Sequence, residues 1–120
     1  MKRVLITGAS SGIGMHLARG YLSEGWQVIA CGRSITKLQG AIAKSHPALT
    51  LCAFDLTEPQ QTIENLQQFK DLDLAILNAG NCEYMDDMAS FDSALFKRQI
   101  DTNVIGTGYC LEGVLGQINE

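Results

Sequence analysis

Three glycines and two serines follow the first apolar run of the chain at a spacing suited to phosphate binding. The stretch Thr7-Gly8-Ala9-Ser10-Ser11-Gly12-Ile13-Gly14 comes directly after Val4-Leu5-Ile6 and opens an amphipathic segment, in the order strand, turn, helix. Glycine permits a tight turn, a close approach of a diphosphate and close helix packing. The first N–H groups of the helix favour an anion. We therefore predict a dinucleotide diphosphate site here; the alternative is a purely structural turn.

A second motif, Asn78-Ala79-Gly80, follows another apolar run, Leu74 to Leu77. The pattern predicts strands over 2–7, 26–31, 49–54 and 73–77, helices over 12–24 and 91–117, and helices that begin at Ser34 and near Pro59. We read residues 81–90 as a loop. Strands that alternate with helices predict an α/β, Rossmann-like, doubly wound parallel sheet with the strand order 3-2-1-4. Both motifs would then end neighbouring strands, at the crevice where the order reverses.

Composition limits the classes of function. The chain has 120 residues, enough for one domain, and its net charge of −4 argues against binding to nucleic acid or an anionic membrane surface. No stretch approaches the roughly 20 apolar residues of a membrane helix. We expect a cytoplasmic protein.

Metal binding is not expected either. The cysteines are scattered singly, as Cys31, Cys52, Cys82 and Cys110. This spacing lacks the close pairs of a zinc site and is typical of buried thiols in a reducing compartment. We read the acidic cluster Glu83, Asp86 and Asp87 as a solvated loop.

Four motifs in this order resemble those of the short-chain dehydrogenase/reductase family, over nearly the whole chain. They are Thr7-Gly8-x-x-x-Gly12-Ile13-Gly14, Asp55-Leu56, Asn78-Ala79-Gly80 and Asp101-Thr102-Asn103-Val104-Ile105-Gly106. The resemblance implies an NAD(P)-binding Rossmann domain of an oxidoreductase that moves a hydride between nicotinamide and a small carbonyl or alcohol substrate. It also implies that Asp55-Leu56 contacts the adenine, that Asn78, Ala79 and Gly80 border the nicotinamide ribose, and that Asn103 is the active-site asparagine. For Asp55, capping of the following helix is the alternative.

The chain departs from the family at the catalytic residues. The family uses a serine and a Tyr-x-x-x-Lys pair, but none of the three tyrosines here is followed four residues later by lysine. We therefore expect residues 1–120 to be the N-terminal, cofactor-binding portion of a longer enzyme, inactive alone. The alternatives are a non-catalytic dinucleotide-binding or interaction module and, less favoured, another Rossmann protein such as a methyltransferase.

The end of the second strand bears on the choice of cofactor. An acidic residue at that position would bind the ribose hydroxyls and repel a 2′-phosphate. Here Gly32 is followed by Arg33, with Ser34 and Lys37 close behind. We predict NADP, with NAD possible because Ser11 replaces the basic residue that phosphate-preferring members often carry. We expect Ser10, Ser11 and Ile13 to line the cofactor. An exposed, purely solvating Arg33 is the alternative.

The long helix 91–117 has apolar residues around much of its circumference, namely Leu95, Ile100, Val104, Leu111 and Leu115. Such a distribution predicts burial on more than one side. Members of the family often pair through this helix. We therefore expect a homo-oligomer, although packing against further parts of a longer chain would leave the same pattern.

Overall fold

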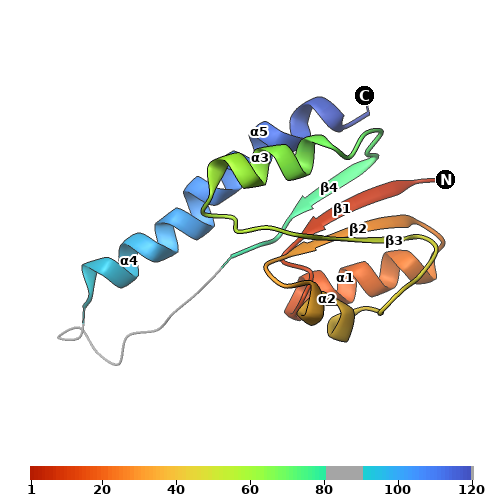
Figure 1. The fold of residues 1–120 in the computed structure, drawn as a ribbon, viewed down its shortest axis with the longest axis horizontal. Helices are drawn as coiled ribbons and strands as arrows, with labels where there is room; N and C mark the ends of the chain where they lie inside the picture. Colours follow the sequence, from red (N-terminus) through yellow and green to blue (C-terminus); the bar gives the residue numbers. More distant parts are fainter. Residues whose placement is uncertain (81–90, 120) are drawn as a thin grey trace.

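The computed structural model describes residues 1–80 and 91–119, in which four parallel strands form one sheet. These are β1 (Arg3–Thr7), β2 (Gln27–Gly32), β3 (Leu49–Ala53) and β4 (Leu74–Leu77), in the spatial order β3-β2-β1-β4 (Figure 1). The predicted α/β class and the order 3-2-1-4 are therefore confirmed. The loop predicted over 81–90 and its acidic cluster lie outside the described residues.

Side chains alternate between the two faces of the central strand. Val4 and Ile6 of β1 point into one apolar cluster and Leu5 points into the other, and all three are fully buried. This period of two is what a strand covered on both sides requires. The register pairs Thr7 with Cys31 of β2 and with Leu77 of β4, so these strands end side by side.

Helices cover both faces of the sheet. Figure 1 shows α1 (Gly12–Ser23) and α2 (Ile35–Ala41) on one face, with α3 (Pro59–Gln67) and α5 (Gly106–Val114) on the other. Pro59 occupies the first turn of α3, as predicted. Two apolar side chains of these helices are exposed, Ile13 by 70% and Ile35 by 40%. Both lie in the first turn of their helix; Ile13 lines a cleft instead of the core.

The predicted single helix over 91–117 is not one regular helix. It begins at Ser93, where the Asp92 side chain accepts a hydrogen bond of 2.9 Å from the Ala94 N–H. Helix α4 (Ser93–Ile100) then continues into a π-helical turn over Asp101–Ile105, then α5, and then a 3₁₀ turn over Leu115–Gln117. Hydrophobic periodicity misses a π turn because the wider turn shifts the register without interrupting the apolar pattern.

The two helices over the second face pack closely because α5 carries glycine at the contact. Helix α5 lies along α3, and a Cβ atom on the buried Gly113 would lie 2.9 Å from Leu66 Cβ and 3.4 Å from Ile63 Cα. Gly106 similarly lies against Leu56. No helix among the described residues has both the length and the apolar character needed to cross a membrane.

This contact predicts opposite effects for two glycine substitutions. We expect Gly113→Ala to lower the free energy of unfolding by about 1–3 kcal/mol, because the new methyl group overlaps the Leu66 side chain and lies tightly against the Ile63 backbone. Gly20→Ala in α1 is the matched control, because its Cβ meets nothing within 4 Å and should add about 0.5–1 kcal/mol through helix propensity. Urea unfolding of both variants measures this, and equal effects would contradict the packing.

Candidate functional site

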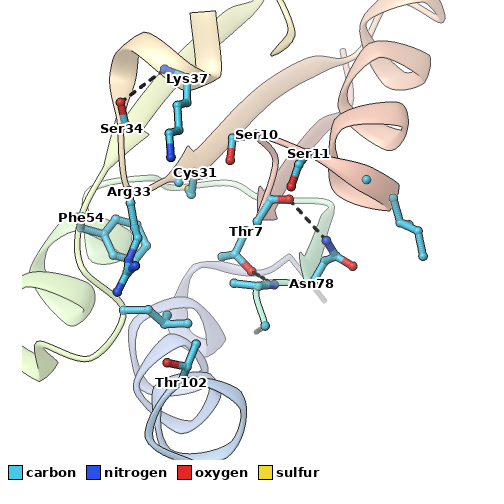
Figure 2. Close-up of a pocket in the computed structure, with 17 residues that line it drawn as sticks. Thr7, Ser10, Ser11, Cys31, Arg33, Ser34, Lys37, Phe54, Asn78 and Thr102 are labelled. Carbon is cyan, nitrogen blue, oxygen red and sulfur yellow. Dashed lines mark hydrogen bonds between the residues drawn. The ribbon is translucent and has the colours of Figure 1, made fainter. Parts of the chain in front are cut away.

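An open cleft of about 580 Å³ lies at the carboxyl ends of the strands (Figure 2). It is lined by residues from all four strand ends and from the π turn: Thr7, Gly8, Ser10, Ser11, Gly12, Ile13, Cys31, Gly32, Arg33, Ser34, Lys37, Phe54, Leu56, Asn78, Ala79, Gly80 and Thr102. This is the crevice where the strand order reverses, and its volume suits a ligand of cofactor size.

The glycine turn is shaped by two different requirements. Gly8 and Gly12 adopt left-handed backbone conformations, with φ of +66° and +56°. Gly14 does not line the cleft; a Cβ there would lie only 2.1 Å from the Gly8 carbonyl oxygen, so the helix can begin against the turn only with glycine at this position. Gly8 and Gly12 thus set the path of the turn, and Gly14 permits its closure.

The start of α1 lies at the cleft, which Ser11, Gly12 and Ile13 line. Ser11 is the residue before the helix, with φ of −161°, and its side chain makes no capping hydrogen bond. The first helical N–H groups have no partner within the helix, and they normally bond to a side chain, water or a ligand. Together with the positive end of the helix dipole they would favour an anion at the start of α1.

Thr7 and Asn78 join the two motifs. The Ala79 N–H donates to Thr7 Oγ1 at 3.1 Å, and Asn78 Nδ2 donates to the Gly8 carbonyl oxygen at 3.4 Å (Figure 2). The two chain segments touch, since a Cβ on Gly8 would lie 2.8 Å from Ala79 Cα. The end of β4 is therefore fixed against the turn.

Two cations stand at the β2 side of the cleft. Arg33 belongs to the loop after β2, and Lys37 to the first turn of α2. The Ser34 hydroxyl accepts a hydrogen bond of 3.3 Å from the Lys37 N–H, so Ser34 caps α2 as the sequence predicts. Figure 2 shows both basic side chains on the same side of the cleft.

Asp55 and Leu56, which follow β3, differ in their relation to the cleft. Leu56 lines the cleft, whereas Asp55 is not among the lining residues. The Asp55 carboxylate accepts hydrogen bonds from the hydroxyl and the N–H of Thr57, at 2.7 and 3.0 Å, and these bonds lower its pKa. The Arg33 charge adds a smaller effect. Glu58 occupies the N-cap position of α3 without a capping hydrogen bond from its side chain, and the Asp55 bonds to Thr57 shape the turn before the helix.

Asn103 lies in the π turn, beside the end of β4. A Cβ on Gly80 would lie 3.2 Å from Asn103 Oδ1, so these two residues are close neighbours, although Asn103 is not among the residues that line the cleft. Thr107 donates a hydrogen bond of 2.9 Å to the Asn103 carbonyl oxygen. π-helical turns occur frequently at functional sites.

Three lining residues were missed from the sequence. The sequence predicts Cys31 as a buried thiol and places Phe54 in a strand. Both are buried, but each lies at or just beyond the end of its strand and so reaches the cleft. The rule that ligands bind at the carboxyl ends of parallel strands could have identified them. Thr102 precedes Asn103 in a helix, and its place at the cleft depends on the π turn.

Comparison with known proteins decides the family. The family model for short chain dehydrogenases matches residues 2–120. The chain belongs to the short-chain dehydrogenase family. It is 34% identical over 107 residues to serine 3-dehydrogenase of Agrobacterium fabrum. The matched region covers 86% of this chain and 43% of that protein. The chain thus spans less than half the length of this curated relative.

Solved structures share the fold. Serine dehydrogenase from Escherichia coli superposes with a TM-score of 0.85 at 28% identity, over 96% of this chain and 55% of that one. ElxO with NADP bound gives a TM-score of 0.82 at 26% identity, over 96% and 49%. No group of three metal-ligating side chains that could hold an ion occurs in residues 1–80 and 91–119.

The link between the motifs can be tested at Thr7. We expect Thr7→Val to lower the free energy of unfolding by about 1–3 kcal/mol, because the Ala79 N–H loses its acceptor at a part-buried position. Thr7→Ser is the control that keeps the hydroxyl. Faster hydrogen exchange at the Ala79 amide in Thr7→Val alone would support the link, and equal exchange in both variants would contradict it.

Proposed function

We propose that this chain binds NADP(H) in the cleft and forms the cofactor-binding part of an oxidoreductase. The observation that carries the proposal is the open start of α1, where Ser11 leaves the first N–H groups uncapped beside a left-handed glycine turn. Backbone donors and a helix dipole that face one cleft are suited to a diphosphate. Family membership supports a nicotinamide dinucleotide in particular.

The lining residues fit three parts of such a ligand. The diphosphate would be held by Ser10, Ser11, Gly12 and Ile13. Leu56, which follows β3, would pack on the adenine. Asp55, which precedes Leu56, would contact the adenine as well.

Asn78, Ala79 and Gly80 would border the nicotinamide ribose at the end of β4, where the small residues leave room. Thr7 and Gly14 would act indirectly, by holding the turn in shape.

The basic side chains favour NADP over NAD. No carboxylate stands at the end of β2, where Gly32 occupies the position, and Arg33 and Lys37 line that side of the cleft. A charge-assisted contact to a 2′-phosphate contributes roughly 1.5–3 kcal/mol. The ElxO structure, which has NADP bound, is similar in fold.

In the whole protein the reaction would be hydride transfer between nicotinamide and a small carbonyl or alcohol. The cofactor supplies the hydride acceptor or donor. This chain would orient the cofactor and exclude other bound geometries, and Asn103 would position a water near the end of β4.

We propose that residues 1–120 bind without turnover, because none of their tyrosines is followed four residues later by lysine. That same observation favours the second candidate, a non-catalytic binding module. We place the protein in the cytoplasm.

The helical segment from α4 to the 3₁₀ turn after α5 would carry the oligomer contact. Its exposed apolar side chains include Phe96, Ile100, Val104, Leu111 and Leu115. They lie apart from the buried residues of α5 that pack on α3, such as Cys110 and Val114. An exposed apolar row of this length is typical of a protein–protein interface.

The cofactor preference can be tested at Arg33. We expect Arg33→Asp to reduce NADPH affinity at least tenfold and to raise or preserve NADH affinity, because the carboxylate repels the 2′-phosphate and accepts hydrogen bonds from ribose hydroxyls. Calorimetric titration of both cofactors measures the ratio. Lys44→Asp, a charge change outside the cleft, is the control. An unchanged NADPH-to-NADH ratio in Arg33→Asp would contradict the proposed preference.

The oligomer contact can be tested at Val104, which is 59% exposed. We expect Val104→Glu to shift the protein toward monomer in analytical ultracentrifugation, because a charge would be buried at the interface. Gln27→Glu adds the same charge at an exposed strand residue and should leave the assembly unchanged. Identical sedimentation of both variants would contradict an interface through this helix.

A further inference from the structure

Two buried cysteines lie opposite each other on neighbouring strands. Cys31 of β2 and Cys52 of β3 are register partners in the parallel ladder. Both belong to the apolar cluster beneath α3 and α5, so their side chains point to the same face of the sheet. They are only 1% and 6% exposed, and neither is needed for the proposed cofactor contacts.

The two thiols also influence each other's ionisation. The neighbouring Cys52 thiol raises the pKa of Cys31, and burial acts in the same direction, whereas the neighbouring Cys31 thiol lowers the pKa of Cys52. Cys52 Sγ also lies 3.6 Å from Asn65 Oδ1. The nearby Cys110 differs, since burial raises its pKa to about 11 and it has no cysteine opposite it in a strand. The pair therefore contains one thiol that ionises more readily than its partner.

We propose that Cys31 and Cys52 form a reversible disulfide when the protein meets a peroxide, and that this oxidation weakens dinucleotide binding in the adjoining cleft. The first half of the proposal rests on the strand register of the two cysteines and on their place in one buried cluster. The second half rests on the proposed function as well.

Strand geometry allows the bond at a small structural cost. Neighbouring strands lie about 4.8 Å apart, which falls inside the range of Cα separations found in disulfides. The Cβ atoms of a disulfide are closer, at about 3.8 Å. The ends of β2 and β3 must therefore approach each other by roughly 1 Å.

The reaction balances with one peroxide molecule. The Cys52 thiolate attacks a peroxide oxygen, the O–O bond breaks, and a sulfenic acid and one water form after proton uptake. The Cys31 sulfur then attacks the Cys52 sulfur, the S–O bond breaks, and a second water leaves with the Cys31 proton. Two thiols are oxidised and hydrogen peroxide is reduced to two waters. A dithiol reductant reverses the bond by exchange.

The cleft would respond because the pair forms part of its wall. Cys31 lines the cleft, and Figure 2 shows it between Thr7 and the Arg33–Ser34 loop. Phe54, two residues after Cys52, lines the cleft as well. A shift of about 1 Å at these strand ends would displace the groups proposed to hold the adenosine half of the ligand.

The disulfide is tested first without any nucleotide. The protein carries Cys82→Ser, so that the three described cysteines remain, and is treated with hydrogen peroxide and then analysed by intact mass and peptide mapping. We expect the loss of two hydrogens and a Cys31–Cys52 linked peptide. Cys52→Ala and Cys52→Ser should abolish the linked peptide, whereas Cys110→Ala, which changes a thiol of the same cluster, should retain it. Circular dichroism identifies variants that fail to fold. Oxygen addition without the linked peptide would overturn the proposal.

NADPH binding to the reduced, oxidised and re-reduced protein is then measured by calorimetry. We expect at least a tenfold loss of affinity on oxidation, full recovery with dithiothreitol, and no loss in peroxide-treated Cys52→Ser. Equal affinity of the reduced and oxidised forms would overturn the regulatory half. If the disulfide forms but the reduced protein does not bind NADPH, the proposed cofactor site fails together with that half, and the thiol pair remains established as a modification site.

Discussion

The candidate site depends on the close contact between Gly14 and the Gly8 carbonyl oxygen. No side chain fits between them, because even a methyl group would lie 2.1 Å from that oxygen. The contact brings the first turn of α1 directly beyond the end of β1, so the start of the helix lies at the carboxyl ends of the strands. The proposed anion site would therefore follow from backbone packing, and no charged side chain would be needed to create it.

A second constraint fixes this turn relative to the rest of the sheet. Thr7 is buried, and its hydroxyl accepts the Ala79 N–H, while the Asn78 side chain donates to the Gly8 carbonyl. The residues after β4 are thus held by the residues after β1. One wall of the cleft is consequently rigid and polar. The opposite wall carries Arg33 and Lys37, where a ligand with an additional phosphate would find its countercharge.

Sequence reasoning succeeded where local pattern and topology agree. Continuous apolar runs bounded by glycine identified the buried strands, and the alternation of strands and helices led to the order β3-β2-β1-β4. The same topology predicts that Gly8 and Asn78 lie at one crevice, and both line the cleft. Ser34 and Pro59 were also predictable, because capping and helix initiation are determined by a few neighbouring residues.

The remaining features depend on packing between distant segments. The π turn over Asp101–Ile105 leaves no mark in the hydrophobic pattern, yet it brings Thr102 to the cleft and Asn103 beside Gly80. The partnership of Cys31 with Cys52 depends on strand register, which composition and spacing do not determine. Ile13 fits an apolar helical stripe by spacing, but its place in the first turn exposes it at the cleft.

The claim that backbone amides at the start of α1 hold the diphosphate can be tested directly by amide NMR during a titration with NADPH. The account predicts that the largest chemical-shift changes fall on the N–H groups of residues 10–14, with smaller changes at Arg33 and at residues 78–80. Saturating NADPH that leaves residues 10–14 unchanged while shifting amides elsewhere would contradict it.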